Sequence, residues 1–229
     1  MAERSNMGLL LDVDGTLVDT EALHFRTWQQ AFRENSIAFS REDFNRLFGL
    51  DPITTVMTLL GCSRERASEV SKRKAELFRE KGDEIKAFPG AAALLSEARK
   101  SGLLIALVSS TSRADVENFL LPAVGPRGIV DLVVTSEMVV QGKPKPDTLL
   151  FAMETLGIAP NRALAAGDTI FDIAAGKAAG VTVVGVSSDA TRARALQAAG
   201  AHRIAANLHE LRKVVSEWVK RVTEFSPGF

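Results

Sequence analysis

The chain has 229 residues, of which 46% are hydrophobic and 24% charged, as expected for a globular protein of one domain with an insert or two modest domains. Its 28 basic and 28 acidic residues give a net charge of zero, and the basic residues form no stripe along the sequence. We therefore expect neither DNA nor RNA as a partner. No run approaches the ~18 apolar residues of a membrane span, and a single cysteine excludes an intrachain disulfide, so we expect a cytoplasmic protein without membrane attachment.

Short apolar runs alternate with helical patterns along most of the chain. The runs cover residues 8–11, 103–108, 132–135, 163–166 and 181–186. The helical patterns cover residues 90–101, 112–121, 147–157, 171–179, 191–199 and 208–222. Apolar strands that are separated by helices indicate an α/β fold with a parallel sheet covered on both faces.

The segment from about residue 20 to residue 87 breaks this alternation. It shows helical periodicity over 21–35, 41–48, 52–60 and 63–81, and no convincing strand. A segment of this length is too large for a loop. We therefore predict a helical cap over residues 20–87, inserted into an α/β core that residues 1–19 and 88–229 form.

The first strand ends in two aspartates, where an open parallel sheet binds its ligands. Asp12 and Asp14 lie two residues apart and therefore start out on one face of the strand. Gly15 allows a sharp turn whose backbone N–H groups face a ligand. Two carboxylates at the end of an apolar strand favour a cation or proton between them. The alternative, for this motif alone, is a strand that ends in polar turn residues.

The next two strands also end in residues that could bind phosphate. Ser109 and Ser110 follow the second strand, where a hydroxyl can bond a phosphate oxygen or simply cap the next helix. Lys143 and Lys145 lie on a loop that two prolines make rigid, and the residues alone do not choose which lysine offsets a phosphate charge. We expect Asp147 to cap the helix that follows.

A further pair of carboxylates follows the run 163–166. Asp168 and Asp172 are four residues apart and face one way in a first helical turn. Their oxygens suit Mg²⁺, although helix capping is the alternative role. Polar residues of complementary chemistry at four successive strand ends favour one shared ligand site.

The four motifs, in order, resemble those of the haloacid dehalogenase superfamily. They are Asp12–Thr20 (DVDGTLVDT), Ser109, 142–144 (GKP) and 167–172 (GDTxxD). The resemblance spans nearly the whole chain, and the helical insert resembles the C1 cap of the phosphatase and β-phosphoglucomutase subfamily. It implies a three-layer, Rossmann-like core with an inserted helical cap domain, and a magnesium-dependent phosphoryl-transfer enzyme.

The resemblance also implies roles for individual residues. Asp12 would attack phosphorus and form an aspartyl-phosphate, while Asp14 would act as acid and base. The phosphate-binding residues would be Ser109, Lys143, Gly15, Thr16 and Ser110. The Mg²⁺ ligands would be Asp12, the backbone carbonyl of Asp14, Asp168 and Asp172. Because Asp14 must carry a proton to act as an acid, we expect burial and its neighbouring carboxylate to raise its pKa.

The first cap helix resembles that of β-phosphoglucomutase over residues 19–28. This resemblance makes His24 a partner of Asp14, and we count both His24 and Trp28 among the substrate-binding residues. The alternative is that Trp28 belongs to the cap core and that His24 is exposed. The basic residues 72–74 also resemble part of that cap, although a basic trio on a helix usually forms a solvated face.

The cap departs from the mutase pattern at Gly49. The mutase has a phosphate-binding arginine after this glycine, whereas Leu50, Asp51 and Pro52 follow here. Residues 181–211 resemble phosphoglycolate and sugar-phosphate phosphatases. We therefore predict magnesium-dependent hydrolysis of a small phosphorylated metabolite, a phosphomonoester. The alternatives are a sugar phosphomutase and a regulatory protein, such as a receiver, that carries a phosphorylated aspartate.

Overall fold

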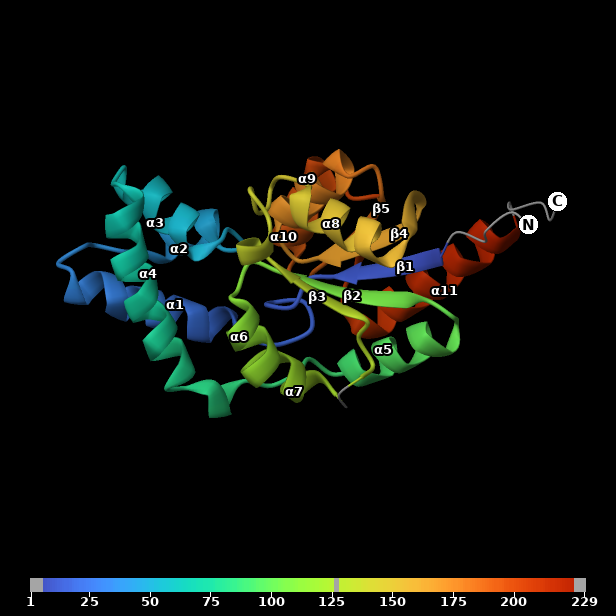
Figure 1. The fold of residues 1–229 in the computed structure, drawn as a ribbon, viewed down its shortest axis with the longest axis horizontal. Coiled ribbons are helices and arrows are strands. Elements are labelled where there is room, and N and C mark those ends of the chain that lie inside the picture. Colours follow the sequence, from blue (N-terminus) through green and yellow to red (C-terminus); the bar gives the residue numbers. More distant parts are fainter. Residues whose placement is uncertain (1–5, 126–127, 225–229) are drawn as a thin grey trace.

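The computed structural model describes residues 6–125 and 128–224 and contains one parallel sheet (Figure 1). Its strands are β1 (Asn6–Leu11), β2 (Leu104–Ser109), β3 (Leu132–Thr135), β4 (Ile158–Gly167), β5 (Thr182–Val186) and β6 (Arg203–Ala205). The strand order is β3-β2-β1-β4-β5-β6. The predicted α/β fold with a parallel sheet is confirmed. Residues 1–5, 126–127 and 225–229 of the predicted core lie outside the described residues.

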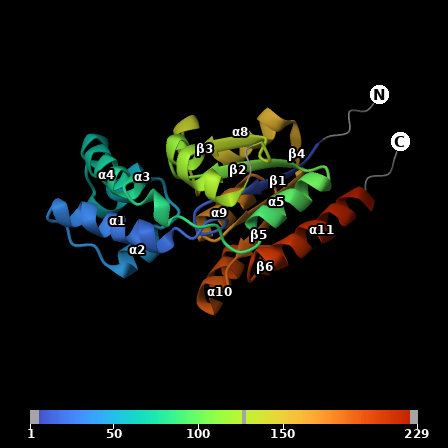
Figure 2. The same ribbon diagram turned by 90° about the horizontal axis from the view of Figure 1, so that it is seen from below.

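Helices cover both faces of the sheet and make three layers (Figures 1 and 2). One face carries α5 (Ala91–Lys100), α7 (Leu121–Val124) and α11 (Leu208–Glu224), and the other carries α8 (Asp147–Leu156), α9 (Ile170–Ala178) and α10 (Ala190–Ala199). Side chains of β1 alternate between the two cores: Leu9 and Leu11 pack on one side and Leu10 on the other. Because both faces are buried, the strand reads as an uninterrupted apolar run.

Four helices between β1 and β2 form the helical insert, which lies beyond the carboxyl end of β1 (Figure 1). They are α1 (Glu21–Glu34), α2 (Arg41–Leu47), α3 (Pro52–Leu60) and α4 (Arg64–Arg79). The insert has its own apolar cluster, whose buried members are Trp28, Phe32, Phe44, Val56, Ala67 and Val70. Local sequence sets the helix starts, since the side chains of Ser40, Asp51 and Ser63 accept backbone N–H groups in the first turns of α2, α3 and α4.

Two linkers, defined here as residues 17–20 and 85–88, join the insert to the core side by side. The backbone N–H of Asp19 donates to the Lys86 carbonyl at 2.8 Å, and that of Phe88 donates to the Leu17 carbonyl at 2.9 Å. The chain therefore leaves the core and returns to it at adjacent points.

Some elements differ from the predictions. The edge strand β6 was not expected, and β4 begins five residues before the predicted run. The predicted helix 112–121 is divided into α6 (Arg113–Asp115), a π-helical turn (Val116–Leu120) and α7. Short 3₁₀ turns also occur at Gly82–Glu84 and Ser136–Met138. In the described part of the chain, no helix has both the length and the apolar character that a membrane span requires.

The prediction that Asp147 is the N-cap residue of α8 is wrong. Pro146 occupies the N-cap position, and Asp147 is the first helical residue. The Asp147 carboxylate instead accepts the backbone N–H of Gln141 at 3.1 Å, which closes the loop that carries Lys143.

Candidate active site

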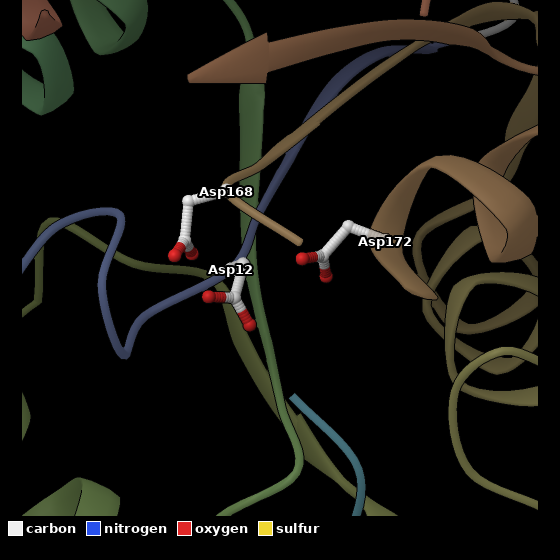
Figure 3. A group of neighbouring side chains, drawn as sticks. All are labelled: Asp12, Asp168 and Asp172. Atoms are coloured by element: carbon white, nitrogen blue, oxygen red, sulfur yellow. The ribbon is translucent and has the colours of Figure 1, made fainter. Parts of the chain in front are cut away.

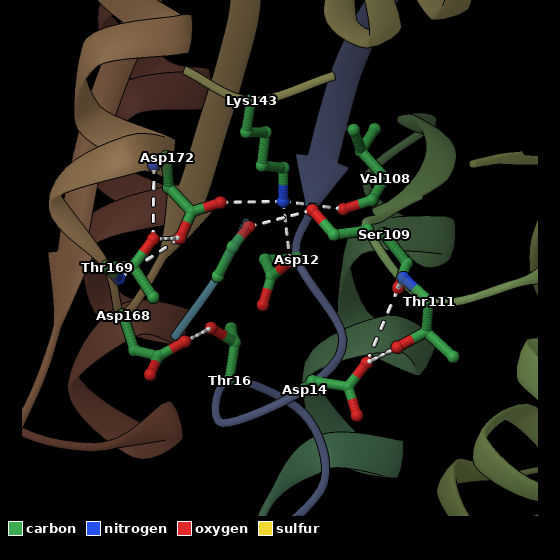
Figure 4. Close-up of polar contacts among 12 residues, drawn as sticks. Asp12, Asp14, Thr16, Val108, Ser109, Thr111, Lys143, Asp168, Thr169 and Asp172 are labelled. Carbon is green, nitrogen blue, oxygen red and sulfur yellow. Dashed lines mark hydrogen bonds and ion pairs between the residues drawn. The ribbon is translucent and has the colours of Figure 1, made fainter. Parts of the chain in front are cut away.

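Lys143 lies at the centre of the polar residues that meet at the carboxyl end of the sheet (Figure 4). Its buried ammonium donates to Asp12 Oδ1 at 2.6 Å and to the Val108 carbonyl at 2.8 Å, and lies 2.6 Å from Asp172 Oδ1. Lys145 is exposed. The structure therefore selects Lys143 as the lysine of this site.

The carboxylates of Asp12, Asp168 and Asp172 point toward one another, with oxygens within 4.8 Å (Figure 3). Burial and the nearby Asp172 charge raise the pKa of Asp168 to about 7. Burial also raises the pKa of Asp12 well above its ordinary value, against the opposing charge of Lys143, and Asp172 adds to the rise. Hard oxygen donors that repel one another fit a divalent cation such as Mg²⁺.

Two hydroxyl groups and a close backbone contact orient these carboxylates. Thr16 Oγ1 donates to Asp168 Oδ1 at 2.9 Å, and Thr169 Oγ1 donates to Asp172 Oδ2 at 2.6 Å. The Thr16 hydroxyl, predicted to bind phosphate, is thus engaged with Asp168. At Gly15 the backbone has φ +79°, and a Cβ atom would lie 2.5 Å from Asp168 Oδ2, so the position requires glycine.

The side chain of Asp14 lies outside the carboxylate cluster and contacts the insert. Its carboxylate accepts hydrogen bonds from Thr20 Oγ1, Thr111 Oγ1 and His24 Nε2, each at 2.8 Å. Burial pushes the pKa of Asp14 upward, but the His24 contact and the hydroxyl donors outweigh burial and lower it below its ordinary value. The expected rise in the pKa of Asp14 is therefore wrong for this state of the protein.

His24 is buried, so the exposed position considered for it is wrong. Its Nδ1 lies 2.7 Å from Lys74 Nζ, and its ring stacks on Phe78 with 4.6 Å between centroids. Burial and the Lys74 charge lower the pKa of His24, and burial lowers the pKa of Lys74 to about 8. An ammonium that donates to Nδ1 leaves the proton of neutral His24 on Nε2, where it faces Asp14.

A cavity of about 50 Å³ separates the core from the insert at this point. Asp12, Asp14, Ser110 and Thr111 line it from the core. The wall contributed by the insert is mainly apolar and includes Trp28, Phe39, Phe44, Leu47, Phe48 and Leu50. Trp28 also packs in the apolar cluster of the insert, so it belongs both to that cluster and to the cavity wall. Among the described residues that line the cavity, Lys74 carries the positive charge, and it already contacts His24.

The two predicted serines have different surroundings. Ser109 Oγ accepts the Thr111 N–H at 3.0 Å and lies 3.4 Å from Asp14 Oδ2, so it faces the site. Ser110 Oγ donates to the Gly49 carbonyl at 2.8 Å and thus joins the core to the insert.

Sequence reasoning missed three residues of the site. No prediction names Thr111, and Lys74 belongs to a basic trio for which a solvated face is the usual role. Arg192, on α10, contacts Glu21 and lies near Asp168, and no motif signals it. Each of these residues has its role because it contacts a residue far away in the sequence, and the spacing of residues along the chain does not reveal such contacts.

A family model for haloacid dehalogenase-like hydrolases matches residues 9–186. The chain belongs to this family, as the sequence motifs implied. The prediction that it is a phosphatase-type hydrolase of the family is confirmed.

Three known proteins illustrate the relationship. Protein CbbY of Rhodobacter capsulatus is 31% identical over 196 residues, which are 80% of this chain and 86% of that protein. Hexitol phosphatase A of Escherichia coli K12 is 33% identical over 192 residues, 82% of this chain and 86% of that protein. A mutant of CbbY from Rhodobacter sphaeroides, solved with xylulose-(1,5)bisphosphate, is 29% identical with a TM-score of 0.78, covering 90% of this chain and 96% of that one.

Proposed function

We propose that this protein hydrolyses a small phosphomonoester, with Mg²⁺ as its cofactor and Asp12 as its nucleophile. The observation that carries the proposal is that Asp12 contacts the Lys143 ammonium at 2.6 Å and shares one cluster with the carboxylates of Asp168 and Asp172. Asp12, Asp168 and Asp172 would hold the Mg²⁺, together with the backbone carbonyl of Asp14. When bound, Mg²⁺ offsets the repulsion between a carboxylate and a phosphate dianion.

The residues divide the reaction into two displacements. In the first, an Asp12 oxygen forms a bond to phosphorus, and the bond from phosphorus to the leaving oxygen breaks as Asp14 gives that oxygen a proton. In the second, Asp14 takes a proton from water, whose oxygen bonds to phosphorus and releases phosphate from Asp12. Ser109 and Lys143 would hold the phosphoryl oxygens throughout, with Gly15, Thr16 and Ser110 at the edge of the phosphate site.

Asp14 must gain a proton before the first displacement. In this structure its carboxylate is held in the ionised form by His24, Thr20 and Thr111. A phosphate dianion in the cavity would raise the pKa of Asp14 through like-charge repulsion. The insert would then act as a cap that brings His24 to Asp14 and excludes water from the acid–base step.

The cavity supports a monophosphate over a bisphosphate. A second phosphate would meet a largely aromatic wall whose cation, Lys74, already contacts His24. Burial of a phosphate without a free cation or donor is unfavourable. We therefore place hexitol monophosphates first among substrates, because hexitol phosphatase A is a relative. The xylulose-(1,5)bisphosphate bound in the CbbY structure makes a pentulose the second class to test, as the bisphosphate and as the monophosphate. We favour hydrolysis over a phosphomutase that binds a bisphosphate.

The test is phosphate release from a panel of esters, with and without Mg²⁺. The panel contains hexitol, hexose and pentulose monophosphates, phosphoglycolate and xylulose 1,5-bisphosphate. We expect release to require Mg²⁺, to be slower with the bisphosphate than with xylulose 5-phosphate, and to fall at least about a thousandfold in Asp12→Asn.

The outcome also separates the alternatives. Equal release by Asp12→Asn and the unmodified protein would remove Asp12 as nucleophile. Absence of release, with conversion of β-glucose 1-phosphate to glucose 6-phosphate, would favour the mutase.

A further inference from the structure

Arg192 is a positively charged residue beside the carboxylate cluster that the proposed reaction does not use. It lies in the first turn of α10, where its backbone N–H donates to the N-cap residue Asp189 at 2.7 Å. Its guanidinium spans two carboxylates: Nη2 donates to Glu21 Oε2 at 2.7 Å, and Nη1 lies 3.5 Å from Asp168 Oδ2. Arg192 therefore contacts the insert and the carboxylate cluster at once.

The two partners of Arg192 belong to different parts of the molecule. Glu21 is the first residue of α1, and its other oxygen lies 3.7 Å from Arg41 of α2, so it is held within the insert. Asp168 follows β4 and is fixed to the core by the Thr16 hydroxyl. The position of the insert therefore decides whether Glu21 remains within reach of Arg192.

Glu21 and Asp168 compete for the Arg192 guanidinium, and the outcome affects how well Asp168 can bind a cation. With the insert in place, Glu21 takes the shorter hydrogen bond and keeps the guanidinium at the edge of Asp168. Without Glu21, Asp168 would be the remaining acceptor in this pair of contacts. A guanidinium drawn closer to Asp168 would repel a divalent cation and occupy an oxygen that the cation needs.

We propose that Arg192 is a positioning residue that couples docking of the insert to the affinity of the carboxylate cluster for a divalent cation. The proposal rests on the metal site of the proposed function. Because such coupling is reciprocal, a cation bound at Asp12, Asp168 and Asp172 favours the docked insert to the same extent. The cap would then close more readily over a site that already holds its cation.

Two single variants test this coupling by shifting cation affinity in opposite directions. Glu21→Gln removes the charge that restrains Arg192, and we expect cation affinity to fall about threefold, the scale of a half-exposed ion pair. Arg192→Met removes the competing charge while keeping an extended side chain, and we expect affinity to rise by a similar factor. The probe is Mn²⁺ alone, titrated into full-length protein while free Mn²⁺ is followed by electron paramagnetic resonance.

The double variant and a control remove a general loss of structure as an explanation. With Arg192 replaced, Glu21→Gln has no charge to release, so the double variant should bind Mn²⁺ as Arg192→Met does. The control is Glu217→Gln, which breaks an exposed ion pair with Arg203 at the start of β6, at the amino end of the sheet. Its affinity should equal that of the unmodified protein.

The results distinguish this inference from the proposed function. Three results would overturn the coupling: shifts of Mn²⁺ affinity in the same direction for both single variants, additive effects in the double variant, or no shift at all. In each case, Mn²⁺ binding by the unmodified protein would still support the metal site. A failure of the unmodified protein to bind Mn²⁺ would remove the metal site and the coupling together.

Discussion

Asp12 and Asp14 are separated by one residue, and their surroundings shift their pKa values in opposite directions. Asp12 lies among carboxylates, which add to the effect of burial and raise its pKa. Asp14 accepts bonds from His24 and two hydroxyls, which lower its pKa despite burial. The proposed reaction requires two such carboxylates. One is a nucleophile that a cation helps to keep ionised, and the other is an acid–base group under separate control.

Asp168 connects the cluster to the pH dependence of stability. Its pKa of about 7 in the folded protein is above the ordinary carboxyl value of 3.8. Without metal, the folded protein retains a proton that the unfolded chain has released between these values, so stability falls as the pH rises through this range. In EDTA, we expect Asp168→Asn to have a higher Tm than the unmodified protein at pH 7.5 and a smaller advantage at pH 5.

With Mg²⁺ in place of EDTA, the unmodified protein should have the higher Tm of the two. The cation should raise the Tm of the unmodified protein at pH 7.5 and have little effect on Asp168→Asn, because the variant lacks one ligand. Glu154→Gln, at an exposed position on α8, is the control. A Tm difference between Asp168→Asn and the unmodified protein that does not change with pH would contradict the account.

Sequence reasoning located the residues that depend on strand ends and missed those that depend on packing. Parallel strands bring their carboxyl ends to one edge, so Asp12, Ser109 and Asp168 could be placed together before the structure was known. Nothing in the order of residues indicates that Lys74 meets His24, because that contact depends on how α1 and α4 pack.

At the scale of elements, the loop between α2 and α3 lies against the start of α9. Gly49 has φ +104°, and a Cβ atom would lie 2.8 Å from Thr169 Oγ1 and Cγ2. Thr169 caps α9 and holds Asp172. The loop that carries Gly49 therefore packs against Thr169, which orients the Asp172 carboxylate.

We expect Gly49→Ala to displace this loop and lower kcat/KM about tenfold or more, because the cavity wall and the Asp172 contact move together. The matched control is Gly61→Ala, at φ +60° in the same insert with no atom within 4 Å of the new methyl group. It should cost about 1 kcal/mol of stability through backbone strain and leave kcat/KM unchanged. Equal losses of kcat/KM in both variants would mean that strain alone explains the effect.

The elements that the sequence failed to predict have physical reasons. β6 has three residues and one neighbour in the sheet, so its pattern is too short to recognise. The first half of β4 contains Pro160 and Asn161, which are typical of turns. The helical segment after Ser112 widens to a π turn that ends at Leu120, two residues before Pro122, which has no N–H to donate to the preceding turn.

At the scale of the whole molecule, the insert has an apolar cluster of its own, while Leu23 of α1 and Phe78 of α4 join the cluster that packs on the sheet. Phe44 lies in the cluster of the insert and is 2% exposed. We expect Phe44→Ala to destabilise the insert by about 3–5 kcal/mol. Hydrogen exchange followed by mass spectrometry should show lost protection in α1–α4 and retained protection in β1, β2 and β4. Equal loss in both parts would contradict the predicted division into a core and a cap at residues 20 and 87.

The paired linkers make the insert an exchangeable part. Asp19 and Lys86 are joined by one backbone hydrogen bond, so the ends of the inserted segment meet, and none of its helices contributes a strand to the sheet. A lineage can therefore lengthen, shorten or replace the segment without changing the register of a single strand. In a protein built this way, Asp12, Lys143 and Asp168 stay with the sheet, whereas His24 and most of the cavity wall change with the insert.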